Sequence, residues 1–221
     1  MDWLNDNTLS VAVRVLSSDL LANPKWADVD LDAFLIAGGD ELEERGTEKS
    51  AAILNGRTRG VRKSRWTVSD ISFLSDLGFC FVAATSIEDD ARAVVASEIP
   101  VILTVTSRAE PASGHAPGGS DRFASTPKLA MARLAAHLGI AAVLLSNPEI
   151  REFPLSLGTA AAIAGLVQSL DDDVPLVVEF PDGMEHGDIS LAERPKIAAV
   201  IVDAPPISRA VELWRELLRS R

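Results

Sequence analysis

The 221-residue sequence has little cysteine and no long apolar run. Its one cysteine, Cys80, cannot form an internal disulfide, and a metal site built from several cysteines is excluded. No stretch reaches the roughly 18 apolar residues that a membrane-spanning helix needs. The first ten residues lack the basic start and apolar core of a secretory signal, so we expect a cytoplasmic protein.

Positive charge is also scarce, since 21 Lys and Arg face 32 Asp and Glu and leave a net charge of −11. A field of that sign repels phosphate groups, which argues against nucleic acid or a membrane surface as the partner. Hydrophobic residues make up 47% of the chain, enough for one substantial core. No linker or shift in composition divides the sequence, so we expect a single α/β domain over residues 1–221.

Several catalytic motifs are missing, namely G-x-G-x-x-G after a strand, the P-loop, G-x-S-x-G and H-E-x-x-H. Their absence weakens the case for a dinucleotide dehydrogenase, a P-loop NTPase, a serine hydrolase or a zinc protease. The function therefore has to be sought in the polar residues that the fold brings together.

What the sequence does contain is a series of short apolar runs rich in β-branched residues. They occupy residues 9–16, 32–38, 78–85, 100–106, 141–146, 175–180 and 197–204. Their nearly continuous hydrophobicity is typical of parallel strands covered on both faces. Helical segments lie between the runs, which predicts an α/β fold. These segments are 40–54, 68–77, 87–98, 126–138, 155–170 and 207–221.

Two topologies fit this order of elements: a seven-stranded doubly wound open sheet and a small (βα)8 barrel. The barrel needs an eighth strand, for which the Arg- and Lys-rich segment 58–66 is the candidate. With that strand the chain has eight βα units of about 28 residues each, slightly shorter than those of an average barrel. The small barrel is the favoured prediction.

Residues 38–41 read Gly-Gly-Asp-Glu and resemble the active-site turn of diguanylate cyclases. That turn joins two antiparallel strands, whereas the residues that follow here favour a helix. Asp40, with Glu43 three residues later, instead fits a capping box at the start of that helix. Two interpretations stay open: Asp40 and Glu41 face a ligand, or Asp40 only caps the helix.

In both topologies ligands bind at the carboxyl ends of the strands, so the polar residues there are the site candidates. Thr104 and Thr106 are among these residues. We predict acid–base groups at Asp40, Glu41, Glu179 and Asp203, and substrate contacts at Ser146 and Asn147.

Five basic residues lie within nine positions of this acidic chain: Arg57, Arg59, Arg62, Lys63 and Arg65. They precede a second predicted capping box, formed by Thr67 and Asp70. A basic segment that leads into a helix N-terminus is suited to bind a phosphate or carboxylate group of a substrate. The alternative is a solvated loop paired with the acidic helix around residues 40–48.

Two loops carry further candidates. Glu179, Asp182 and His186 form a donor set that suits Mg²⁺ or Mn²⁺, or else they belong to a polar surface loop. Residues 107–125 are rich in Gly, Pro and Ser and form either a lid that carries His115 to the site or a disordered segment.

Together these features predict a cytoplasmic enzyme that acts on a small anionic metabolite by lyase-, isomerase- or aldolase-like acid–base chemistry. The alternative is a non-catalytic regulatory or assembly subunit. Such a subunit would use residues 57–65 and the Ala/Gly-rich helix 157–170 for partner contacts. Close packing of that helix could also join copies of the chain into a homo-oligomer.

Overall fold

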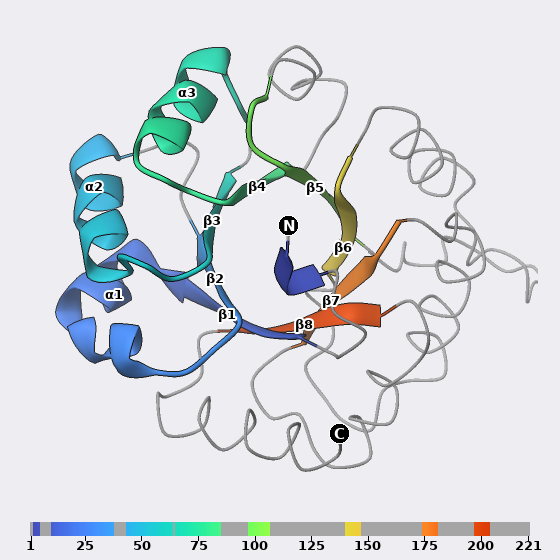
Figure 1. Cartoon of the computed structure of the whole chain (residues 1–221), viewed down its shortest axis with the longest axis horizontal. Coiled ribbons are helices and arrows are strands. Elements are labelled where there is room, and N and C mark those ends of the chain that lie inside the picture. Colours follow the sequence, from blue (N-terminus) through green and yellow to red (C-terminus); the bar gives the residue numbers. More distant parts are fainter. Residues whose placement is uncertain are drawn as a thin grey trace, which may run out of the picture.

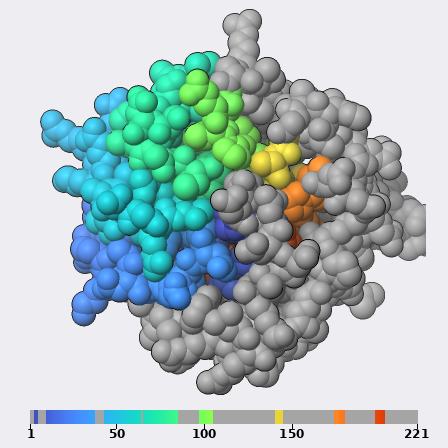
Figure 2. Space-filling view, in the orientation of Figure 1, coloured from blue at the N-terminus to red at the C-terminus, as the bar shows by residue number. Residues whose placement is uncertain are grey.

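The computed structural model describes residues 2–4, 10–37, 43–63, 65–84, 97–106, 140–146, 174–180 and 197–203. Its eight parallel strands pair in chain order, and the last pairs with the first, so the sheet closes into a barrel (Figure 1). The predicted small barrel is therefore confirmed, and the open sheet is excluded. Figure 2 shows the N-terminal part, coloured from blue to green, as one continuous face of the molecule.

The strands are β1 (Ser10–Leu16), β2 (Ala33–Ala37), β3 (Arg59–Lys63), β4 (Phe81–Ala84), β5 (Val101–Thr106), β6 (Ala142–Ser146), β7 (Leu176–Phe180) and β8 (Ile197–Asp203). The helices of the described residues are η1 (Asp2–Leu4), α1 (Ser17–Ala22), η2 (Pro24–Asp28), α2 (Glu44–Ile53) and α3 (Val68–Asp76). Each strand lies within a predicted run, and β3 is the basic segment. Apart from 40–54 and 68–77, the predicted helices lie wholly or largely outside the described residues.

The helix boundaries correct one prediction and confirm another. Because α2 begins at Glu44 with Glu43 as its N-cap, the prediction that Asp40 caps this helix is wrong. At α3 the capping box is present: Thr67 Oγ1 accepts from the Asp70 amide, and the Asp70 carboxylate accepts from the Thr67 amide. The helices α1 and η2 were not predicted, because segments of five or six residues are too short to show a helical period.

Side chains alternate along each strand and so divide the apolar residues into two groups. One group lies between the strands and the helices and includes Val13, Phe34 and Val82 from the sheet with Leu20 and Leu74 from α1 and α3. The other group fills the inside of the barrel. This division fixes which residues of each strand can face a ligand inside the barrel.

The helix η1 lies at the centre of the ring of strands in Figure 1 and fills the amino-terminal end of the barrel. Its Trp3 ring is centred 5.3 Å from that of Phe81, the first residue of β4, and its Trp3 carbonyl accepts from Ser10 Oγ. Gly60 makes room for this pair, because a Cβ there would lie 2.3 Å from the Phe81 ring. A ligand therefore has to enter from the opposite, carboxyl end.

The strand registers arrange the inward side chains in layers. Arg14 on β1 pairs with Leu35 on β2, which pairs with Gly60 on β3. Because the strands tilt against the barrel axis, the residue at the height of Arg14 is two positions beyond Gly60, at Arg62. The same two-residue step leads around the odd-numbered strands from Arg62 to Thr104, to Glu179 and back to Arg14.

Candidate functional site

Among the layers of inward side chains, we consider the one nearest the carboxyl end of the barrel for which the structure describes all four side chains. All four of these side chains are polar. We name this set, Arg14, Arg62, Thr104 and Glu179, the polar layer. The layer beneath it comes from the even-numbered strands and is apolar and completely buried; its members are Leu35, Ala83, Leu144 and Ile201. The Arg14 and Arg62 side chains are 27% and 18% exposed. Solvent thus reaches the polar layer but not the apolar layer beneath it.

Three members of the polar layer form a charge cluster. Arg14 Nη1 lies 2.8 Å from Glu179 Oε1, and Arg62 Nη1 lies 3.0 Å from Glu179 Oε2. The Glu179 side chain is only 7% exposed, so its charge is held away from water by two guanidinium groups. Guanidinium groups bind carboxylate and phosphate groups well, so these two arginines suit the cluster to an anionic ligand.

Of the predicted site residues, the structure brings Arg62 and Glu179 together in the polar layer. Asp203, at the end of β8, is the register partner of Arg14, and Ser146 ends β6 as the partner of Thr106. These two positions therefore belong to the same end of the barrel. The remaining strand-end, loop and lid candidates lie outside the described residues: Asp40, Glu41, His115, Asn147, Asp182 and His186.

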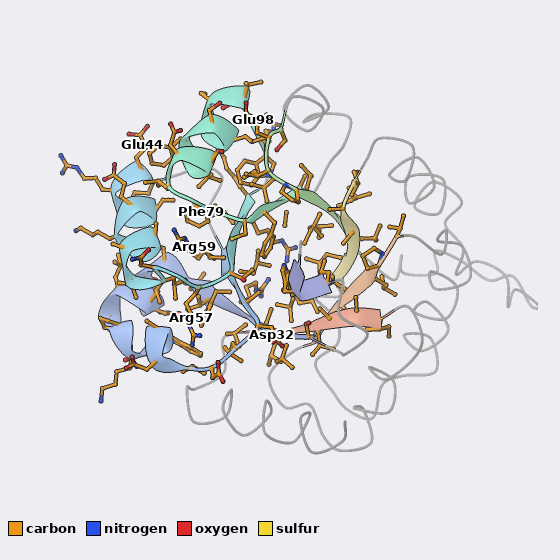
Figure 3. The ribbon with its side chains drawn as sticks, in the orientation of Figure 1. Asp32, Glu44, Arg57, Arg59, Phe79 and Glu98 are labelled. Atoms are coloured by element: carbon orange, nitrogen blue, oxygen red, sulfur yellow. The ribbon has the colours of Figure 1, made fainter. Side chains whose placement is uncertain are left out.

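The basic segment does not form one site, because neighbouring residues of a strand point to opposite faces. Arg57 precedes β3 and donates to the carbonyls of Ala27 and Val29. Arg59 starts β3 and lies outside the ring of strands beside Phe79 (Figure 3). Arg65 is exposed. Of these basic residues, only Arg62 reaches the polar layer.

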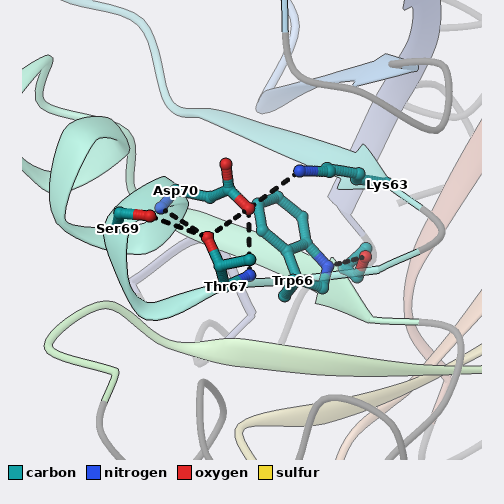
Figure 4. A network of polar contacts seen from close by, with 6 residues as sticks. Lys63, Trp66, Thr67, Ser69 and Asp70 are labelled. Atoms are coloured by element: carbon teal, nitrogen blue, oxygen red, sulfur yellow. Dashed lines mark hydrogen bonds and ion pairs between the residues drawn. The ribbon is translucent and has the colours of Figure 1, made fainter.

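Lys63 belongs to a separate network on the outer side of β3 (Figure 4). Its Nζ lies 2.8 Å from Asp70 Oδ2 and 5.7 Å from the centre of the Trp66 ring. The Trp66 Nε1 donates to the Ala83 carbonyl at 3.2 Å. These contacts fasten β3 and β4 to the start of α3. Within this network Lys63 has a structural role, and its amine does not face the polar layer.

The pKa of Asp70 reflects two opposed effects. Burial of the carboxyl group raises its pKa, but hydrogen bonds from Lys63 and Thr67 outweigh burial and hold the pKa below its ordinary value of 3.8. Because the pKa of Asp70 is lower in the folded protein than in the unfolded chain, the carboxylate makes its full contribution to stability above pH 3.8. That contribution is lost as the pH falls through the folded pKa.

We therefore expect Asp70→Asn to lower the free energy of unfolding by about 1–2 kcal/mol at neutral pH, since it removes a capping carboxylate and its ion pair. The difference from the wild type should shrink as the pH falls below 3.8, where the wild-type carboxylate takes up its proton. Urea unfolding of both proteins between pH 2 and pH 7 measures this difference in the free energy of unfolding. Asp76→Asn, the same change at an exposed position of α3, is the control; a difference that persists unchanged at low pH contradicts the expectation.

Sequence reasoning missed Arg14 as a site residue. Its signal is one arginine inside the apolar strand Ser10–Leu16, at a position that alternates with Val13 and Val15. A charge placed there needs a buried partner, but the rule that ligands bind at strand ends does not include this position. Thr104 lies near a strand end, but its sequence context predicts no role for it.

The described part of the chain contains no group of three His, Cys, Asp or Glu side chains that could bind the predicted divalent metal ion. Both carboxylate oxygens of Glu179 already accept from guanidinium groups. A metal ion there would have to displace two cations. Since Asp182 and His186 lie outside the described residues, the Mg²⁺ or Mn²⁺ site stays a prediction.

No family model and no curated protein matches the sequence. Solved structures match nearly the whole chain. Phosphoribosyl anthranilate isomerase from Thermotoga maritima has a TM-score of 0.64 at 12% identity, over 96% of this chain and 100% of that one. The 7,8-dihydropteroate synthase from Vibrio fischeri gives 0.62 at 13%, over 97% and 93%. An HpcH/HpaI aldolase from Desulfitobacterium hafniense gives 0.63 at 11%, over 99% and 94%.

The closed parallel barrel and these likenesses define the chain as a protein with the (βα)8-barrel, or TIM-barrel, fold. At identities of 11–13% the likeness shows the fold alone. None of the described helices combines the length and the apolar character that a membrane crossing requires.

Proposed function

We propose that the chain is a barrel enzyme that acts on a small substrate bearing a carboxylate or phosphate group, by acid–base chemistry of the lyase, isomerase or aldolase kind. The observation that carries the proposal is the polar layer, in which two partly exposed arginines and a carboxylate lie directly above a buried apolar layer. Barrel enzymes hold their active sites at this carboxyl end. The matched barrels include proteins described as an isomerase, a synthase and an aldolase, which supports an enzymatic role.

In this proposal Arg14 and Arg62 bind the anionic group of the substrate. That group competes with Glu179 for the two guanidiniums, and a Glu179 carboxylate released from them can accept or return a proton. Asp203, whose strand position pairs with Arg14, is the second proposed acid–base group. Ser146, Asn147, Asp40 and Glu41 remain proposed substrate contacts and acid–base groups from the neighbouring strand ends.

A thermal-shift screen tests the proposal with inorganic phosphate and small phosphorylated and carboxylated metabolites, with and without Mg²⁺ or Mn²⁺. A specific ligand raises the melting temperature by mass action, and calorimetric titration then gives its affinity. We expect Arg62→Met to weaken that affinity at least about tenfold, a loss equivalent to about 1.4 kcal/mol. Arg45→Met removes the same charge from an exposed position of α2 and is the control.

A flat response across the whole panel, or equal loss of affinity in both arginine variants, contradicts the proposal. A flat response favours the alternative of a non-catalytic regulatory or assembly subunit. Light scattering on the purified chain would then ask whether it forms a homo-oligomer, for which helix 157–170, outside the described residues, is the proposed contact.

A further inference from the structure

Thr104 on β5 differs from the other members of the polar layer. Its Oγ1 has no hydrogen-bond partner in the part of the chain that the structure describes. The residue is 3% exposed, so bulk water does not take the place of that partner. The three charged members, by contrast, are joined by ion pairs.

A threonine is a costly residue at such a position. A buried hydroxyl without a partner destabilises the fold, whereas valine would fill nearly the same volume with no polar atom. The layer beneath Thr104 uses apolar side chains throughout, so the barrel interior does not require a hydroxyl for packing. A buried hydroxyl that has no hydrogen-bond partner is suited to bind an oxygen atom of a ligand.

The position of Thr104 favours binding a ligand at two points. Among the odd-numbered strands that form the polar layer, β5 lies between β3 and β7. Thr104 thus has Arg62 on one side and Glu179 on the other. For a ligand that binds Arg62 through an anionic group, Thr104 is therefore the adjacent member of the polar layer.

We infer that the substrate is a small hydroxy acid or oxo acid, whose carboxylate binds Arg14 and Arg62 and whose second oxygen binds Thr104 Oγ1. This inference rests on the proposed function and names its substrate class. The guanidiniums already bind one planar carboxylate, that of Glu179, so a substrate carboxylate meets donors of matching geometry. The Thr104 hydroxyl donates to a carbonyl oxygen or accepts from a hydroxyl group.

Three small acids test this inference. Propionate, lactate and pyruvate share a three-carbon skeleton, and their second carbon carries no oxygen, a hydroxyl and a carbonyl oxygen, respectively. We expect the wild type to bind lactate or pyruvate at least about tenfold more tightly than propionate, in calorimetric titrations or in NMR titrations of the full chain. Thr104→Ser, which keeps the hydroxyl, should keep this preference, and Thr104→Val should lose it.

Two results overturn the inference and leave the proposed function standing: equal affinity of the wild type for the three acids, or an unchanged preference in Thr104→Val. If none of the acids and no inorganic phosphate binds, the proposed function fails and this inference fails with it. The melting temperature of Thr104→Val serves as the folding control. We expect it to equal or exceed that of the wild type, because the variant removes an unsatisfied buried hydroxyl.

Discussion

Replacing Arg59 with methionine should lower the free energy of unfolding by about 3–5 kcal/mol, because two charge-assisted hydrogen bonds are lost and the carbonyl of Leu77 loses its donor. The Arg59 Nη1 donates to the Leu54 carbonyl at 2.7 Å, and Nη2 donates to the Leu77 carbonyl at 2.7 Å. Leu54 and Leu77 are the C-cap residues of α2 and α3. One guanidinium group therefore caps the C-termini of both α2 and α3.

The surroundings of Arg59 explain why its loss is costly. The residue is 7% exposed, and its guanidinium carbon lies 5.3 Å from the centre of the Phe79 ring. Burial lowers the pKa of Arg59, and the nearby Cys80 opposes this shift. The guanidinium stays charged, so its hydrogen bonds to the carbonyls stay strong.

Urea unfolding of Arg59→Met measures the expected loss, and Arg59→Lys serves as the comparison. Lysine keeps the charge, but its single ammonium group cannot bind the carbonyls of both helix ends at once. The free energy of unfolding of Arg59→Lys should therefore lie between those of Arg59→Met and the wild type. Arg45→Met, at an exposed position of α2, should stay within about 0.5 kcal/mol of the wild type. An Arg59→Met variant as stable as Arg45→Met contradicts the expectation.

Replacing Glu179 with glutamine should lower the free energy of unfolding by roughly 2–4 kcal/mol, because two arginines then lose the carboxylate that both of them bind. Glutamine has nearly the same shape and leaves no cavity. The loss therefore reports the charge of the carboxylate that binds Arg14 at 2.8 Å and Arg62 at 3.0 Å.

The same variant should respond more strongly than the wild type to simple anions. Without the competing carboxylate, phosphate or sulfate can bind the two guanidiniums, and an anion at about 100 times its dissociation constant returns close to 2.7 kcal/mol. The melting temperature is measured against phosphate concentration at constant ionic strength, with Glu98→Gln as the control at an exposed site. Equal phosphate responses in the two variants would contradict an anion site in the polar layer.

The strands were predictable because each one is a short run of nearly continuous hydrophobicity. Strand β3 was the hardest to predict, since Arg59, Arg62 and Lys63 make it the most basic of them. It is nevertheless a strand, because each of these charges has a specific partner: helix-end carbonyls for Arg59, Glu179 for Arg62 and Asp70 for Lys63. The composition of the segment gave no sign of these partners.

The candidate site was only partly predictable. The rule that ligands bind at strand ends selected Glu179 and the basic segment, but it could not separate Arg62 from its neighbours. It also passed over Arg14, which lies within a strand. The contact between Arg62 and Glu179 joins residues 117 positions apart, and no local pattern records such a distance.

By itself, the sequence determined the strands, the α/β class and the residues that could carry charge, because hydrophobic periodicity and helix caps are local properties. The tertiary structure decided which of those charges meet. Closure of the barrel and the tilt of its strands set the height of each inward side chain, and they place Arg14, Arg62, Thr104 and Glu179 in one layer. Height in a closed barrel depends on the registers of all eight strands together, so it emerges only when the sheet has closed.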